Sequence, residues 1–216
     1  MKKSLILTAL LAAIVLWGGV LAGCSDDSSS GSSSYYIPST ADSQTAADSL
    51  PAPVGTDPFK TGLYKSVSTP KNDDEEPYTE YFRVDTDNRT MTFYEDENEE
   101  EEEGDVIVKY TYNEGNHTIT MALYKIAIDT GFVGKEGYEN YMDDVVKKVN
   151  DVIKDTNDSE YREFLEEIRD GIIEDKTENA KLFAEPYIYS YTVSADGNTV
   201  TFEDDEEKSV ATFLHE

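Results

Sequence analysis

Three segments of the sequence, residues 82–93, 110–121 and 191–202, align with one another without gaps. Each contains an alternating apolar stretch, a turn rich in Asp, Gly and Asn, and a second stretch that reads Thr-apolar-Thr-apolar. Alternation with a period of two predicts a β-strand with one buried face, and the turn residues tolerate a positive φ. We therefore expect one β-hairpin, repeated three times. The turn pairs Asp87-Asn88, Gly115-Asn116 and Asp196-Gly197 are interpreted as turn residues rather than metal ligands.

Two further alternating stretches, one before the first hairpin and one after the last, bring the expected number of strands to eight. Short antiparallel strands in sequence order are typical of a meander, and closing the meander removes its exposed edges. The fold predicted from the sequence is therefore mainly β, an eight-stranded antiparallel up-and-down barrel. Its strands are expected at residues 63–68, 78–85, 90–95, 106–113, 117–126, 187–194, 199–203 and 208–214.

A helical insert of about residues 137–185 is expected between the fifth and sixth strands, with two or three helices. Apolar residues recur every three or four positions from Tyr138 to Ile153, which makes a continuous helical stripe. Asn157-Asp158-Ser159 can end this helix and cap the next, where the pattern repeats from Tyr161 to Ile173. Each helix is expected to bury one face against an end or a flank of the barrel.

This strand pattern resembles the lipocalin-like superfamily. Gly62-Leu63-Tyr64 lies near the first expected strand, where lipocalins carry Gly-x-Trp. The chain departs from that pattern by its tyrosine, by the absence of the lipocalin cysteines and by the helical insert. The resemblance implies a lipocalin-like barrel architecture.

The first 24 residues resemble a bacterial lipoprotein leader. Lys2 and Lys3 precede an apolar run, and small residues follow it, as in a secretion signal. Leu21-Ala22-Gly23-Cys24 resembles a lipobox, whose cysteine receives a diacylglycerol and an N-acyl chain. The resemblance implies a signal peptide over residues 1–23 and a lipid anchor at Cys24. Apart from these lipid groups and the weak Ca²⁺ binding considered below, we expect no cofactor. The alternative is an uncleaved spanning helix, because the apolar run is nearly long enough to cross a bilayer.

Residues 24–57 are rich in Ser, Asp, Ala, Thr and Pro, and this composition predicts a disordered tether. Residues 58–216 are then expected to form the barrel domain with its helical insert. Ser25, which follows the cysteine where an Asp would indicate inner-membrane retention, favours the outer membrane or the cell surface within the cell envelope.

The formal net charge of −28 excludes a nucleic-acid binder and favours a monomer. In a meander, successive loops alternate between the two ends of the barrel, so the loops around residues 73–76, 95–105 and 203–207 gather at one end. Eighteen of the 46 acidic residues lie in them. We favour a solvated acidic fringe, and two alternatives stay open. One is a cationic protein partner, and the other is weak Ca²⁺ binding, with Asp73, Asp74, Asp204 and Asp205 as candidate ligands.

Tyrosine offers a second candidate site. Alternation places five tyrosines on strand faces that can point into the barrel, where a phenol suits an amphipathic ligand. A core filled by these rings is the favoured alternative, because eight strands leave an interior that side chains can fill. The five candidates are Tyr110, Tyr112, Tyr187, Tyr189 and Tyr191.

Catalytic motifs are missing from the sequence. It contains no glycine-rich phosphate loop, no Gly-x-Ser-x-Gly elbow and no zinc signature. We therefore expect a non-enzymatic, membrane-anchored lipoprotein that binds a small amphipathic ligand in its barrel. The alternative is a surface interaction protein that presents its acidic end to a cationic partner or to Ca²⁺.

Overall fold

The computed structural model describes residues 45–72, 76–94, 96–100, 102 and 104–216. Eight strands form a closed antiparallel barrel, because each pairs with the next along the chain, β9 returns to β1, and β4 pairs with β5. The predicted fold class is confirmed, and the strand ends agree with the prediction to within two residues. The eight are β1 Gly62–Pro70, β2 Tyr78–Asp85, β3 Thr90–Tyr94, β4 Val106–Asn113, β5 Thr118–Ile128, β7 Tyr187–Val193, β8 Thr199–Glu203 and β9 Glu207–His215.

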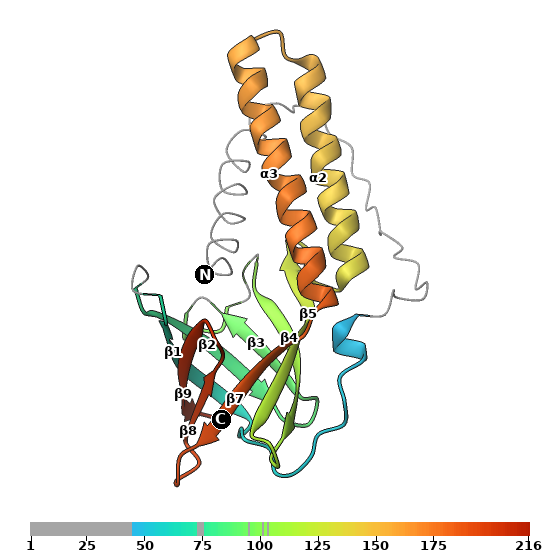
Figure 1. The fold of residues 1–216 in the computed structure, drawn as a ribbon. Helices are drawn as coiled ribbons and strands as arrows, with labels where there is room; N and C mark the ends of the chain where they lie inside the picture. Colours follow the sequence, from blue (N-terminus) through green and yellow to red (C-terminus); the bar gives the residue numbers. More distant parts are fainter. Residues whose placement is uncertain (1–44, 73–75, 95, 101, 103) are drawn as a thin grey trace.

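The three tight turns lie at one end of the barrel, as predicted, and we call this the turn end (Figure 1). The remaining loops and the helices lie at the opposite end, the loop end. In the first two turns the positive φ falls on the last loop residue, Arg89 and His117 (both 52°), rather than on Gly or Asn. A four-residue loop commonly returns to its strand through one left-handed residue, whatever its identity. In the third turn Gly197 takes this role, with a φ of 68°.

Two long helices, α2 (Lys135–Asp155) and α3 (Ser159–Ala184), form a hairpin that rises from the loop end (Figure 1). Asp158 caps α3 as expected, since its carboxylate accepts the backbone N–H groups of Glu160 and Tyr161 at 2.9 and 3.0 Å. The buried faces of the helices pack on each other and on β5. That cluster includes Leu123, Ile126, Tyr138, Met142, Val149, Ile172 and Phe183.

A short strand, β6 (Gly131–Val133), was not predicted. It pairs with the last residues of β5, from Ile126 to Ile128, and so extends that strand pair beyond the barrel toward the helices. Gly131 has a φ of 104°, which allows the chain to reverse directly after β5. Three residues are too few for an alternation pattern, so the sequence carries no usable signal for β6.

Residues 45–60 form a strap that runs along the outer wall of the barrel to the turn end (Figure 1). The short 3-10 helix η2 (Ala46–Asp48) packs its alanines on Ala122 of β5. Farther on, the backbone N–H of Val54 donates to the carbonyl of Tyr112 at 2.9 Å. The predicted tether over residues 24–57 is therefore too long, because residues 45–57 belong to the folded part. The rest of it, with Cys24 and the predicted signal peptide, lies outside the described residues.

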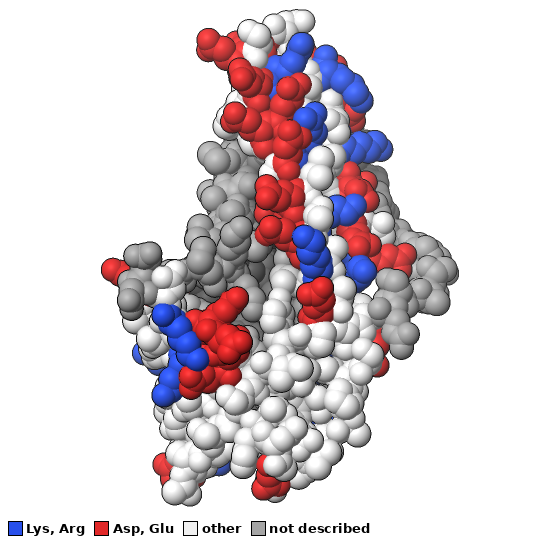
Figure 2. Space-filling view, viewed as in Figure 1, with Lys and Arg blue, Asp and Glu red and all other residues white. Residues whose placement is uncertain are grey.

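Charge is unevenly distributed over the surface. Figure 2 shows acidic and basic side chains gathered on the helical hairpin and at the loop end, whereas the barrel wall below them carries few charges on this face. Among the described residues, no helix is both long and apolar enough to cross a membrane.

Substitution of Gly62 tests how closely β1, the first strand of the barrel, approaches β9, the last. Its φ is 140°, and an added Cβ would lie 2.4 Å from the carbonyl oxygen of His215. We therefore expect Gly62→Ala to lower the free energy of unfolding by about 1–3 kcal/mol, measured by urea denaturation. Gly171→Ala is the matched control, because Gly171 lies within α3 and an added Cβ meets nothing within 4 Å. This variant should gain about 0.5–1 kcal/mol from helix propensity. Equal stabilities of the two variants would contradict the close approach.

Candidate functional site

The interior of the barrel is closed at the turn end by one aromatic ring. Phe59, from the strap, inserts between the strands and is 5% exposed. It meets the rings of Tyr64, Phe82 and Tyr110 edge-on, with centroids 5.5, 6.2 and 5.6 Å away. Edge-to-face contacts at such distances are favourable beyond the area they bury. The half of the barrel interior toward the turn end is therefore a packed aromatic core.

Hydrogen bonds hold this plug in place. Tyr110 donates its hydroxyl to Asp57 Oδ2 at 2.9 Å, and the backbone N–H of Phe59 donates to Asp57 Oδ1 at 3.0 Å. The hydroxyl of Tyr64 accepts the backbone N–H of Lys60 at 2.8 Å. Burial raises the pKa of the Asp57 carboxyl, and burial together with Asp57 raises the pKa of the Tyr110 phenol well above its usual range. Both phenol groups thus have structural partners in the strap.

The half of the interior toward the loop end is different in kind, and we call it the polar half. Met121 of β5 and Phe202 of β8, the strand partners of Tyr187 and Ser209, bring apolar side chains to it. Further inward-facing side chains come from β1, β2, β7 and β9, as the strand alternation requires. Most of them are hydroxyl or carboxyl groups rather than hydrocarbon. The polar half comprises Ser66, Ser68, Tyr78, Glu80, Tyr187, Tyr189, Glu207 and Ser209.

One side of the polar half is a wall of small residues on two neighbouring strands. Ser66 pairs with Ala211 and Ser68 with Ser209 across β1 and β9. The hydroxyls of Ser68 and Ser209 are hydrogen-bonded to each other at 2.6 Å. The Ser66 hydroxyl is also buried, but it has no hydrogen-bond partner among the described residues. A buried hydroxyl without a partner costs free energy, so Ser66 is an unusual feature of this wall.

Glu80 is a carboxyl group of the polar half whose pKa is strongly raised. It lies opposite Ser66 in the pairing of β1 with β2. Burial, and then the nearby carboxylate of Glu207, raise the pKa of Glu80 to about 7. Glu80 is closely surrounded by protein, yet its side chain keeps some exposed surface, as expected for a group inside a barrel that is plugged at the other end.

The second carboxylate, Glu207, is bonded to a phenol. Tyr78 donates its hydroxyl to Glu207 Oε2 at 2.8 Å. Burial and the two glutamates hold the pKa of Tyr78 well above its usual range, so the phenol stays neutral and acts as a donor. Among the described residues, no lysine or arginine forms an ion pair with Glu80 or Glu207. The polar half therefore carries negative charge without a matching cation.

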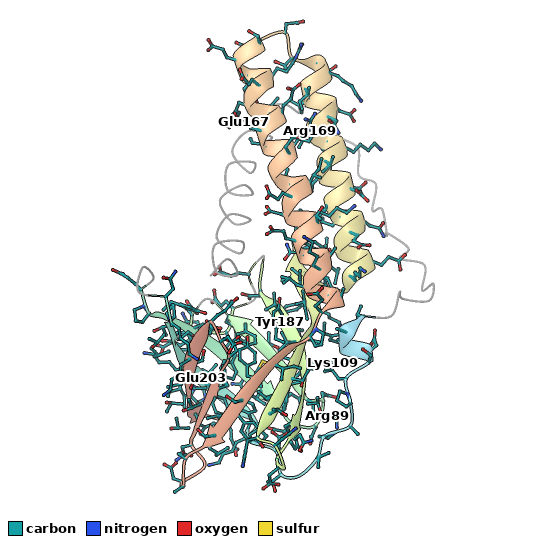
Figure 3. All side chains as sticks on the ribbon, viewed as in Figure 1. Arg89, Lys109, Glu167, Arg169, Tyr187 and Glu203 are labelled. Carbon is teal, nitrogen blue, oxygen red and sulfur yellow. The ribbon has the colours of Figure 1, made fainter. Side chains whose placement is uncertain are left out.

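The five tyrosines singled out from the sequence all belong to the barrel core or pack against it. Tyr189 and Tyr187 lie in the polar half, and Figure 3 shows Tyr187 near the base of the helical hairpin. Burial and nearby acidic groups raise the pKa of Tyr189, whose ring meets Phe202 edge-on at 5.9 Å. Tyr110, Tyr112 and Tyr191 lie toward the turn end. The candidates are thus divided between the packed and the polar halves.

Sequence reasoning missed Tyr78, Glu80, Glu207 and Ser66. A usable signal existed, because strict alternation along β2 places Glu80 on the same face as Phe82 and Val84, both fully buried. The acidic runs around it drew attention to the loops instead of to this inward position.

The calcium candidates can be followed only in part. Asp204 Oδ1 accepts the backbone N–H groups of Glu206 and Glu207 at 2.8 and 2.9 Å, so it caps the turn before β9. Asp205 lies in the same turn, while Asp73 and Asp74 lie outside the described residues. Within the described part of the chain, no three His, Cys, Asp or Glu side chains gather closely enough to hold a metal ion.

Two basic side chains form ion pairs with acidic residues of the segments 95–105 and 203–207. Arg83 makes a two-pronged ion pair with Glu99, in which Nη2 lies 2.8 Å from Oε1. Lys71 Nζ lies 2.7 Å from Glu203 Oε1. Part of the acidic run that was expected to be a solvated fringe is therefore tied to the barrel wall.

A groove of about 720 Å³ lies near the turn end, where the strap and the β4–β5 turn meet β7 and β8. Its lining includes Asp57, Glu114, His117 and Tyr191. None of its lining residues belongs to the polar half. Figure 3 shows Lys109 on the same side of the barrel as η2, and its Nζ lies 3.8 Å from Asp48 Oδ1 in the strap.

Comparisons with known proteins found no match. No family model, no curated protein and no solved structure matches this chain. The functional argument therefore depends on the barrel interior and on the sequence.

Proposed function

We propose that this chain is a non-enzymatic lipoprotein of the bacterial cell envelope whose barrel binds a small amphipathic ligand. The observation that supports this proposal best is the uneven interior. One half is a packed aromatic core closed by Phe59, and the other half carries hydroxyl and carboxyl groups. The ligand enters from the loop end, because the turn end is plugged.

Amphipathic character follows from what the interior offers. A bound molecule would meet the rings of Phe202 and Tyr189 on its apolar side and the oxygens of Ser66, Glu80 and Glu207 on its polar side. Binding sites for small molecules are typically apolar with a few well-placed polar groups. The small side chains along β1 and β9 leave more room than leucine or phenylalanine would.

Anchoring depends on the lipobox. A diacylglycerol thioether and an N-acyl chain at Cys24 would hold the protein on a membrane, since each buried methylene contributes about 0.8 kcal/mol. Ser25 favours the outer membrane or the cell surface. The strap (residues 45–60) would then lie, along the chain, between Cys24 and the barrel.

A second candidate function is capture of a cationic protein at the loop end. The observation that favours it is the group of acidic side chains on the helical hairpin and at the loop end, among which basic side chains also lie (Figure 2). Such a surface would accelerate association with a basic partner in a salt-dependent way.

Substitution of the lipobox cysteine tests the anchor. Cys24→Ser removes the sulfur that would receive the diacylglycerol, so we expect loss of radiolabelled palmitate incorporation and accumulation of the unprocessed form. The measurement is labelling followed by gel electrophoresis and membrane fractionation. Ser25→Ala is the matched control and should label normally. Unchanged size and labelling of the Cys24→Ser variant would rule out the lipid anchor.

Occlusion of the polar half tests ligand binding. The mature chain would lack tryptophan, because Trp17 belongs to the predicted leader, so binding of the neutral amphipathic fluorophore N-phenyl-1-naphthylamine can be followed without background. We expect saturable enhancement with the unmodified protein and about tenfold weaker binding by Ser209→Phe, whose ring would fill the polar half. Thr212→Phe is the control, because Thr212 lies on the outward face of the same strand. Equal binding by both folded variants, or no saturable binding at all, would contradict the proposal.

A further inference from the structure

We infer that the polar half of the barrel selects ligands that carry an ammonium group on an apolar body. This inference rests on the proposed function and names the chemical class of the ligand. It is carried by three features of the interior that point to the same place. These are two carboxyl groups without a cation, a buried hydroxyl without a partner, and aromatic rings beside both.

The first feature is uncompensated charge. Glu80 and Glu207 face the same interior, and the carboxylate of Glu207 disfavours ionisation of Glu80. Removal of like charges from water is costly unless an opposite charge accompanies them. Since none of the ion pairs among the described residues includes Glu80 or Glu207, a cationic ligand would supply the missing charge.

The second feature is the Ser66 hydroxyl. Ser66 is 1% exposed and points inward from β1. Its partner in the pairing of β1 with β2 is Glu80. An ammonium group has up to three N–H donors, and it could donate to Glu80, Glu207 and Ser66 together. The other buried hydroxyl without a partner, Thr111, lies on the outward face of β4 and has no such neighbours.

The third feature is the set of aromatic rings beside the two glutamates. Burial raises the pKa values of both Tyr78 and Tyr189, and nearby charges raise them further: Glu80 and Glu207 act on Tyr78, and Glu207 acts on Tyr189. A phenol ring attracts a cation through its face and packs against hydrocarbon through the same surface. The apolar body of the ligand would lie toward Phe202, which meets Tyr189 edge-on. An anionic ligand would be repelled by the same groups.

A bare metal ion fits this site less well than an ammonium group. Hard divalent cations require several oxygen ligands around one point. Within the described residues no cluster of three acidic, histidine or cysteine side chains is close enough to provide them. The site offers the carboxylate of Glu207, which accepts one hydrogen bond from Tyr78, the carboxyl of Glu80 and the hydroxyl of Ser66. These acceptors suit an organic cation with directed N–H groups.

Binding should depend on pH. Because the pKa of Glu80 is about 7, half of its carboxyl groups are ionised near neutral pH. Affinity for an amine that stays protonated over this range should therefore rise as the pH rises through 7. The other titratable groups that face Glu80 are Tyr78 on its own strand, Glu207 on β9 and the two tyrosines of β7. The phenols have pKa values raised above their usual range and stay neutral in this interval.

A matched series of probes tests the inference. Phenethylamine, 2-phenylethanol and 3-phenylpropionate share one apolar body and carry a cation, a neutral hydroxyl and an anion. Isothermal titration calorimetry of the purified full chain at about pH 8 should give at least about tenfold tighter binding of the amine than of the alcohol, and no binding of the anion. At about pH 5.5 the advantage of the amine should shrink severalfold, as Glu80 becomes protonated.

Glu80→Gln should remove about tenfold of the amine affinity and leave the alcohol unchanged. Glu97→Gln, which changes an exposed acid at the same end of the barrel, is the matched control and should change neither. If Glu80→Gln fails to fold, Ser66→Ala replaces it and should weaken amine binding severalfold.

Different experimental results would overturn this inference and the proposed function. Equal affinity for amine and alcohol, or an amine affinity that Glu80→Gln leaves unchanged, would overturn the inference while N-phenyl-1-naphthylamine still binds. Loss of saturable binding for the fluorophore and for every member of the series would overturn both.

Discussion

Insertion of Phe59 into the turn end of the barrel is the contact on which the rest of the structure depends. A closed eight-stranded barrel leaves an interior that side chains can fill completely, and hydrogen bonding alone would leave its two ends alike. The Phe59 ring makes them different. It packs with Tyr64, Phe82 and Tyr110, and Asp57 holds both the strap and the Tyr110 hydroxyl. The ring thereby completes the hydrophobic core at the turn end.

The other half carries groups that weaken the fold. An acid whose pKa is raised by folding contributes stability that is fully present below its ordinary pKa and is lost as the pH rises through the raised value. For Glu80 this interval runs from 4.5 to about 7. The unpartnered Ser66 hydroxyl adds a second cost. The aromatic half compensates for both, and strained or unsatisfied groups of this kind tend to gather at binding sites.

Alternation and turn chemistry were sufficient to predict the barrel. The Thr-apolar-Thr-apolar strands, the sharing of one end by the three turns and the Asp158 cap are all local patterns, and the structure confirms each of them. The strap escaped prediction because a single ring at Phe59, in a segment otherwise poor in large apolar residues, makes its contacts only in the folded barrel. Glu80 was missed because only the acidic runs of the loops, and no single acid within a strand, were considered as candidate charged sites. Its position among Phe82 and Val84 was nevertheless encoded in the alternation of β2.

The central claim, that Glu80 lies inside the barrel beside Glu207, can be measured directly by titration of its carboxyl carbon in carbon-13 NMR spectra, with the resonance assigned through Glu80→Gln. An enclosed Glu80 should titrate near 7 and move downward when Glu207 is changed to Gln. A Glu80 resonance that titrates at its ordinary value of 4.5 in the folded protein, with no response to Glu207→Gln, would show that the carboxyl is solvated and would contradict the account.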